Sequence, residues 1–227
     1  VGLTITIFFG IYGITHFSKD SRIEQLTTLE NVKSDTLKIF LTSHDNFYWD
    51  EKNLNVVETE DGEHKLISNV EMGVARSHDS QYHLKIIKRA SARSFKEARG
   101  SVENILYQYS VDSEHVQLDQ YFKISSHYPY QKQSIELILF VPTGKAVYLD
   151  ESLKYFIYDI KNTTNTHDYK MVGHNWTMGD DGLFNEFFKN KSSMNKTKKI
   201  KFIEFGDEDE DAMEELEIQK KVLIEKQ

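Results

Sequence analysis

Short apolar segments separated by turn residues recur through most of this chain, and they constrain its fold more than any other feature. In the clearest group, residues 134–141 and 146–149 are apolar and rich in β-branched and aromatic residues. Pro142-Thr143-Gly144 separates these two segments, and residues 154–160 follow as a third. Short β-rich runs bounded by turn residues are typical of strands. We therefore predict three short strands here, in a sheet that grows by small steps.

The same pattern begins near residue 36, where Leu37, Ile39 and Leu41 alternate with other side chains. Further apolar runs with similar spacing occupy residues 54–57, 66–74 and 82–88, with a turn signal at Asp61-Gly62. One strand per 8–12 residues, roughly, is typical of an all-β fold. We predict a mainly β domain over residues 36–188, built as a single-layer or solenoid-like stack of short strands, although no fixed-length repeat is visible.

Residues 94–107 interrupt this β pattern with helical spacing. The apolar residues that would form one stripe on a helix are Phe95, Ala98, Val102, Ile105 and Leu106. Ser94 followed by Glu97 fits a capping box, in which the two side chains bind backbone N–H groups at the start of the helix. Gly100 weakens such a helix by about 1 kcal/mol relative to Ala. We predict one inserted helix of about three to four turns, packed on the sheet.

The chain opens with an apolar run, residues 1–17, and has no charged side chain before Lys19. As a helix this run would span roughly 26 Å, slightly less than the hydrocarbon core of a bilayer. We interpret it as the C-terminal part of a transmembrane helix. A signal-peptide core or a buried strand is the alternative. Residues 18–35 are polar, and we predict that they form a juxtamembrane linker. The three-residue spacing of Ile23, Leu26 and Leu29 leaves a short interfacial helix as the alternative.

The composition changes again near the other end of the chain. A basic stretch at residues 189–201 precedes an acidic run at residues 207–211. Adjacent blocks of opposite charge are typical of a solvated tail, so we predict a charged tail over residues 189–227, with weak helical spacing at 212–227. The formal net charge of −8 argues against a nucleic-acid partner, and the absence of Cys excludes disulfides and thiolate metal sites.

Sequence motifs for catalysis, metal binding and cofactor binding are absent. The chain contains no HExxH, no GxSxG and no phosphate-binding glycine loop. His78 and His83 are five positions apart with Asp79 between them, which is poor spacing for metal ligands. Asp180-Asp181 lies beside glycines, and Asp150-Glu151 follows a predicted strand, so turns explain both carboxylate pairs better than acid–base catalysis. We predict no catalytic residue, no metal site and no cofactor.

Aromatic residues crowd the middle of the chain. They are Tyr121, Phe122, Tyr128, Tyr130, Tyr148, Tyr155, Phe156 and Tyr158. Core packing and cross-strand ladders are the commoner use of such residues in β-sheets, whereas an exposed row of them could stack on sugars. Trp176, between Gly173 and Gly179, is predicted to close the end of the β stack. Asn162 and Asn175 match the pattern for N-glycosylation.

Several of these segments also resemble a known family. The order VPTGKAVYLD, YDIKN and MVGHNWTM resembles the C-terminal region of Bacteroidota proteins related to phage shock protein C (PspC). Residues 94–107, followed by YQYSVDSEHVQLDQYFKI, resemble the same family, so that the resemblance covers about residues 36–178. In that family a β-rich "toastrack" domain follows several membrane helices. The resemblance implies a non-catalytic, membrane-anchored sensor or scaffold in bacterial envelope-stress signalling.

The same resemblance implies a location in the bacterial inner (cytoplasmic) membrane. The expected partners are membrane lipid, through residues 1–17, and other proteins or further copies of this chain. Lys19 and Arg22 lie among acidic residues, which weakly favours the periplasmic side for the β-domain. The alternative, based on the aromatic residues, is a surface-exposed glycan-binding or adhesin-like β-helix protein.

Overall fold

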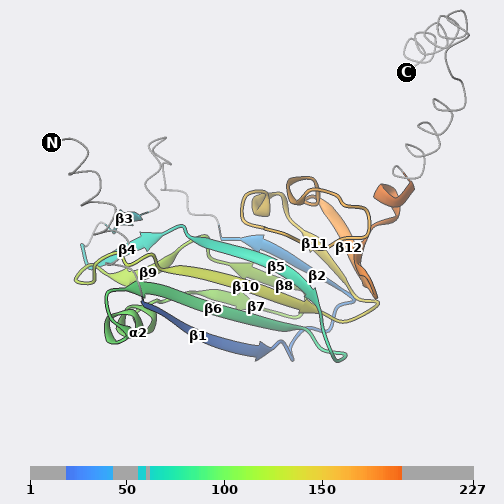
Figure 1. Cartoon of the computed structure of the whole chain (residues 1–227). Helices are drawn as coiled ribbons and strands as arrows, with labels where there is room; N and C mark the ends of the chain where they lie inside the picture. Colours follow the sequence, from blue (N-terminus) through green and yellow to red (C-terminus); the bar gives the residue numbers. More distant parts are fainter. Residues whose placement is uncertain (1–18, 43–55, 60–61, 191–227) are drawn as a thin grey trace, which may run out of the picture. The chain divides into compact units, whose positions relative to one another are not determined.

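The computed structural model describes residues 19–42, 56–59 and 62–190 (Figure 1). The chain divides into two units, Val1–Asn185 and Glu186–Gln227. Residues 186–190 of the second unit are described, and they are helical. The predicted transmembrane helix at residues 1–17 lies outside the described residues, as does all but the start of the predicted charged tail. Within the described ranges, no helical segment combines the length and the hydrophobicity needed to cross a bilayer.

The first unit is mainly β, as predicted, and its strands form three sheets. The four-stranded sheet has the order β1 (Lys19–Thr28), β6 (His83–Ala92), β10 (Ser134–Val141) and β5 (Val70–Arg76). The six-stranded sheet has the order β13 (Gly182–Phe184), β12 (His174–Gly179), β11 (Ala146–Leu149), β2 (Thr36–Leu41), β8 (His115–Leu118) and β7 (Tyr109–Val111). The three-stranded sheet consists of β3 (Val56–Glu58), β4 (His64–Ile67) and β9 (Phe122–Ser125).

The sequence predicted a single-layer or solenoid-like stack, but the strands form three separate sheets. The strand order within these sheets does not show a solenoid-like stack. Strands β10 and β5 are parallel, and β2 is parallel to both of its neighbours, β11 and β8. The other strand pairs are antiparallel. Parallel partners need long connections, so strands that are distant in the sequence become neighbours. A pattern of local runs cannot reveal such pairings.

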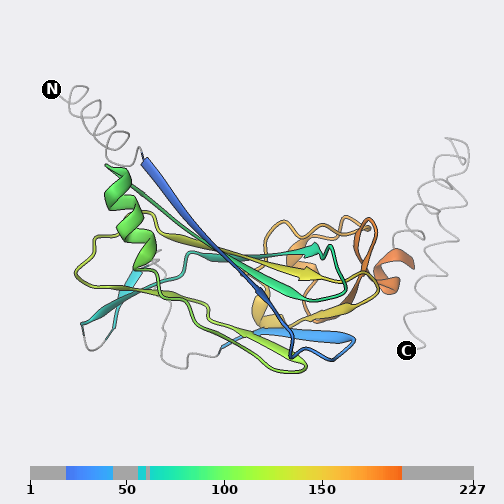
Figure 2. The same ribbon diagram turned by 90° about the horizontal axis from the view of Figure 1, so that it is seen from below.

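The core lies between sheets that are layered over part of their length (Figures 1 and 2). Alternation places one side of most strands in this core, as with the fully buried Leu37 and Ile39 of β2. Tyr82, just before β6, is also buried, and its hydroxyl donates a hydrogen bond of 3.2 Å to the carbonyl of Ala146 in β11. Burial, together with the charge of Asp35, raises the pKa of Tyr82 to about 12, so the neutral hydroxyl joins elements of two sheets.

The predicted helix is present as α2 (Phe95–Glu103), which contacts β1 and β6. Ser94 is its N-cap, and the Ser94 hydroxyl accepts a 3.2 Å hydrogen bond from the backbone N–H of Glu97, as the capping box predicted. The helix was expected over residues 94–107, but it ends at Glu103 with Asn104 as its C-cap. Leu106 instead exchanges backbone hydrogen bonds of 2.8 Å with Lys123. Its side chain is exposed, as is that of Phe95, so the buried stripe is narrower than predicted.

The linker predicted at residues 18–35 is wrong over most of its length. Residues Lys19–Thr28 form β1, which pairs with all ten residues of β6 in antiparallel register. The spacing of Ile23, Leu26 and Leu29 concealed this strand because it fits a helix better than a strand. Strand β1 lies at the edge of its sheet, most of its side chains are polar, and none is buried, as is common at sheet edges.

Two other predicted strands differ from the structure. The run at residues 66–74 is divided between β4 and β5, which belong to different sheets, and the Asn69 side chain between them donates a 2.9 Å hydrogen bond to the carbonyl of Gln133. Residues 154–160 are not a strand. They follow the short helix η1 (Glu151–Leu153) as turns, and Ile157 makes a single bridge with Met72. The predicted strands at residues 134–141 and 146–149 are confirmed as β10 and β11.

Candidate functional site

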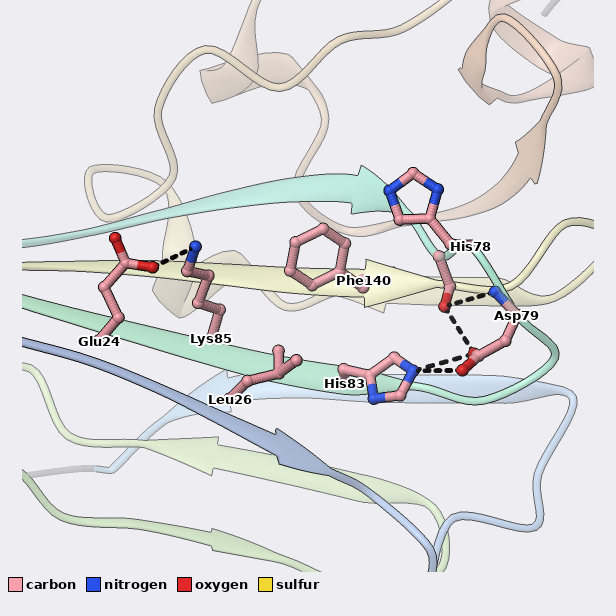
Figure 3. A pocket seen from close by; sticks show the side chains of 8 residues that line it. Glu24, Leu26, His78, Asp79, His83, Lys85 and Phe140 are labelled. Atoms are coloured by element: carbon pink, nitrogen blue, oxygen red, sulfur yellow. Dashed lines mark hydrogen bonds and ion pairs between the residues drawn. The ribbon is translucent and has the colours of Figure 1, made fainter.

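A groove of about 450 Å³ lies on the four-stranded sheet, on the side opposite the core. Strands β1, β6 and β10 supply its walls, and the turn between β5 and β6 closes one end (Figure 3). The lining residues are Glu24, Leu26, Ser77, His78, Asp79, His83, Lys85 and Phe140. We call this surface the outer groove.

Strand register explains why these side chains meet. Leu26 of β1 pairs with Lys85 of β6, and Phe140 of β10 pairs with His83 of β6. Directly paired residues project to the same face of an antiparallel sheet. Leu84, between the two β6 residues, points the other way and is buried in the core. Among the residues that line the outer groove, the apolar side chains are Leu26 and Phe140, and the others are polar.

Leu26 is the most unusual of these residues, because 63% of this large apolar side chain is exposed. An ion pair lies beside Leu26 at one end of the groove, where Lys85 Nζ is 2.5 Å from Glu24 Oε2 (Figure 3). Arg22 also pairs with Glu24. The hydrogen bond from Lys85 and the two positive charges hold the pKa of Glu24 below its usual value. One end of the outer groove is therefore charged.

The other end is organised by Asp79 in the β5–β6 turn. The backbone N–H of Gln81 and the hydroxyl of Ser77 each donate a 2.9 Å hydrogen bond to Asp79 Oδ1. His83 Nε2 lies 2.9 Å and 3.0 Å from the two carboxylate oxygens. The Gln81 N–H, followed by His83 and Ser77, lowers the pKa of Asp79 to about 2. Asp79 is therefore ionised at neutral pH and holds the turn closed.

His83 connects this turn to the edge strand. Its Nδ1 atom lies 3.0 Å from the Thr28 hydroxyl, while Nε2 faces Asp79. The order of hydroxyl, imidazole and carboxylate is also found in hydrolase triads. Here, however, Asp79 also binds the backbone of its own turn, and Thr28 pairs with His83 in the sheet. These hydrogen bonds attach β1 to the β5–β6 turn, and this structural role explains the arrangement without a catalytic reaction.

The two histidines singled out in the sequence do not converge. Figure 3 shows the ring of His78 pointing away from His83. Across the described part of the chain, no group of three or more His, Asp and Glu side chains is placed to hold a metal ion. The expectation that the chain binds no metal and no cofactor stays a prediction.

The carboxylate pairs behave as the sequence predicted. Asp180-Asp181 forms the turn between β12 and β13, and Arg76 Nη1 lies 3.3 Å from Asp180 Oδ1. Asp150 is the N-cap of η1, where its side chain accepts a 2.9 Å hydrogen bond from the backbone N–H of Ser152. Both pairs therefore have structural roles.

The aromatic residues divide into two groups. Tyr121, Phe122 and Phe156 are buried, whereas Tyr128, Tyr130, Tyr155 and Tyr158 are exposed, and Tyr148 in β11 is half-buried. Trp176 is fully buried in β12, and its indole N–H donates a 2.8 Å hydrogen bond to the carbonyl of Met171. It packs inside the domain.

The two potential glycosylation sites differ in their surroundings. The amide nitrogen of Asn162 donates hydrogen bonds of 3.1 Å and 2.8 Å to the carbonyls of Ile160 and Thr166. Its carbonyl oxygen accepts a 2.8 Å hydrogen bond from the Thr166 N–H. Asn162 is therefore a loop-stabilising residue, whereas Asn175 lies exposed in β12.

The sequence singles out His78, Asp79 and His83 but does not reveal the apolar residues of the outer groove, Leu26 and Phe140. Leu26 lies in the predicted linker, and Phe140 lies in a predicted strand without further distinction. The available signal was the alternation of Glu24, Leu26 and Thr28 along one side of a strand, but polar residues at both faces of β1 obscured it.

Comparison with known proteins gives one match. Residues 56–186 match a protein family described as "ToastRack found in some PspC", a toast-rack domain of the PspC C-terminus. No curated protein and no solved structure matches the chain. The match covers more than half of the sequence and most of the described strands. We conclude that this chain belongs to the family of toast-rack domains found at the C-terminus of some PspC proteins.

Proposed function

We propose that this chain is a non-catalytic, membrane-anchored sensor or scaffold domain in bacterial envelope-stress signalling. The family supports the link to PspC proteins. The observation that carries the contact role is the outer groove, where Leu26 is 63% exposed between two charged ends. Exposed apolar surface rimmed by polar residues is typical of protein interaction sites.

The groove suits a partner segment with an apolar side chain between polar ones. An apolar side chain of the partner covers Leu26 and Phe140 and removes their surface from water, which is the main favourable contribution to association. The Glu24–Lys85 pair and the Asp79–His83 pair then select polar groups on either side of that contact. Charged rims of this kind contribute to specificity and association rate more than to affinity.

The anchor in this proposal is residues 1–17, which lead directly to β1. Because β1 lies at the edge of the four-stranded sheet and forms one wall of the outer groove, its start connects the anchor to the contact surface. We place the domain on the periplasmic side of the inner membrane. Fractionation of cells that express the full-length protein containing this chain, together with protease accessibility in spheroplasts, tests this placement. Accumulation in the soluble fraction contradicts the membrane anchor, and protection from external protease contradicts the periplasmic side.

A photo-crosslinking amino acid at position 26 of the 227-residue chain tests the contact role in living cells. We expect a defined protein adduct whose amount changes under envelope stress. Position 106 provides the matched control, because Leu106 is also an exposed leucine, at 54%, but lies outside the groove. The same adducts at both positions, or no adduct at position 26 under either condition, contradict the proposal.

A substitution distinguishes a functional contact from accidental proximity. Leu26→Glu places a charge in the middle of the groove without creating a cavity in the core. We expect the Leu26→Glu chain to lose the stress-dependent adduct, detected from a second crosslinking position at residue 140, while keeping its thermal transition. Leu106→Glu should keep both. An unchanged adduct in the Leu26→Glu chain means that the outer groove is not the contact surface.

A further inference from the structure

A second groove, of about 460 Å³, lies elsewhere in the same unit, beside the short helix η1. Its lining residues are Leu41, Ser68, Val70, Gln120, Ser152, Tyr155 and Phe156. They come from the end of β2, the start of β5 and the segments before β9 and after β11. None of them lines the outer groove. We call this second surface the Tyr155 groove.

Tyr155 is the feature that distinguishes this groove. Its side chain is 92% exposed, although the neighbouring Phe156 is 5% exposed and Leu153 is fully buried. The backbone around Tyr155 is thus anchored while its ring remains accessible to solvent. Lys154 Nζ lies 5.6 Å from the ring centroid. Exposure of an aromatic ring at the wall of a groove provides a flat apolar surface with a polar hydroxyl at its tip.

Hydrogen bonds hold the segment that carries Tyr155 in one conformation. The backbone N–H of Leu41 donates a 3.0 Å hydrogen bond to the hydroxyl oxygen of Ser152. On the other side of Tyr155, the Met72 N–H donates to the carbonyl of Phe156 at 2.9 Å, and the Tyr158 N–H donates to the carbonyl of Met72 at 3.0 Å. The ring therefore stands on a segment attached to both β2 and β5. Such preorganisation lowers the entropy lost when a ligand binds.

The chemistry of the lining points to an uncharged ligand with both polar and apolar surface. Leu41, Val70 and Phe156 supply apolar surface, and none of the described residues that line this groove is charged. Ser152 keeps its hydroxyl hydrogen to donate, because its oxygen accepts from the Leu41 N–H. Gln120 supplies an amide with two donor hydrogens and one acceptor oxygen. A few polar groups in an otherwise apolar groove fix the orientation of a bound molecule.

We propose that the Tyr155 groove binds an uncharged oligosaccharide. A sugar ring presents C–H groups on its faces and hydroxyl groups around its edge. One ring stacks on Tyr155 through its C–H face, while Gln120 and Ser152 bind hydroxyl groups at its edge. The volume falls within the range of roughly 300–1,000 Å³ that holds small ligands, which fits a few sugar units. This site is independent of the proposed signalling role, since the two grooves share no lining residue.

Isothermal titration of the 227-residue chain with three neutral tetrasaccharides tests the proposal: β-1,4-linked N-acetylglucosamine, β-1,4-linked glucose and α-1,4-linked glucose. We expect at least one to bind with a Kd below about 1 mM. Tyr155→Ala should weaken that binding about tenfold, which corresponds to a contact of about 1.4 kcal/mol. Gln120→Ala should also weaken it. Tyr130→Ala is the matched control, because Tyr130 is an exposed tyrosine, at 41%, outside this groove.

Thermal unfolding of each variant separates loss of binding from loss of structure. The Tyr155→Ala chain should keep the transition temperature of the unsubstituted chain, because its side chain contributes little buried surface. The proposal is overturned when none of the three tetrasaccharides binds, or when Tyr130→Ala weakens binding as much as Tyr155→Ala. Tyr155-dependent binding to phosphatidylglycerol vesicles without sugar binding also overturns it and assigns the groove to lipid. None of these results affects the crosslinking test of the outer groove.

Discussion

A chain that begins at residue 56, where the family match begins, should fail to fold. The reason is β2, which precedes this boundary and yet occupies an interior position of the six-stranded sheet, between β11 and β8. Without β2, those two strands lose their shared neighbour and the sheet is divided. A chain that begins at residue 18 keeps both β1 and β2. We expect it to fold, because residues 1–17 are proposed to be an anchor outside the domain.

The structure allows an estimate of how much stability the domain loses when β2 is removed. Leu37 and Ile39 are fully buried, and burial of such side chains stabilises by about 1.5–3 kcal/mol each. Backbone hydrogen bonds are lost as well, such as the 2.8 Å bond from the Lys38 N–H to the carbonyl of Glu114. Each contributes about 0.5–1.5 kcal/mol net. Together these terms are comparable with the whole stability of a typical domain, which is about 5–15 kcal/mol.

Circular dichroism and urea unfolding of chains 18–227 and 56–227 provide the assay. Chain 18–227 should show a cooperative transition and a β-type spectrum, and chain 56–227 should show neither. Single substitutions measure the contribution of individual side chains to the free energy of unfolding. Leu37→Ala should lower the free energy of unfolding by about 2–5 kcal/mol, whereas Leu26→Ala, at an exposed position, should change it by at most about 0.5 kcal/mol. A cooperative transition in chain 56–227 refutes the role of β2. Loss of the transition in chain 18–227 refutes the anchor, because residues 1–17 then belong to the fold.

Three further variants test individual contacts. Asp79→Asn should lower the melting temperature at pH 7. Because the folded-state pKa of Asp79 is lowered from 3.8 to about 2, its stabilising effect is present above pH 4, roughly, and the difference between the two chains should vanish as the pH falls toward 2. Trp176→Phe leaves the buried Met171 carbonyl without its indole donor and should cost about 1–3 kcal/mol in urea unfolding; an unchanged midpoint contradicts that role. Asn162→Ala removes the hydrogen bonds to the Thr166 backbone and should speed proteolysis of its loop, with Asn175→Ala as the exposed control.

Elements stabilised by local interactions could be predicted from the sequence. The runs at residues 134–141 and 146–149 became strands with the expected bounds, because each is a short apolar, β-rich run that ends at a turn. The N-cap at Ser94 was also correct, since the capping box depends on residues three positions apart. The turn at Asp180-Asp181 follows the same rule. These features need no knowledge of distant parts of the chain.

Features set by distant partners could not be predicted. Strand β1 is a strand because β6 lies beside it, and its own residues fit a polar linker equally well. Residues 154–160 have the composition of a strand, but only Ile157 finds a partner. The outer groove depends on β1, so Leu26 could not be recognised as part of its surface, nor Thr28 as a partner of His83, before the fold was known. Exposure of Tyr155 likewise follows from how its neighbours pack.

The interior position of β2 also governs the order in which the domain is completed. Thr36 pairs with Ala146 and Lys38 with His115, so both neighbours of this early strand are synthesised long after it. During synthesis, the apolar side chains of β2 therefore stay uncovered until the chain has emerged past residue 149. Non-local parallel pairing of this kind slows folding and prolongs exposure to aggregation. A chaperone that binds the exposed apolar side of β2 is therefore most needed before β11 has been synthesised.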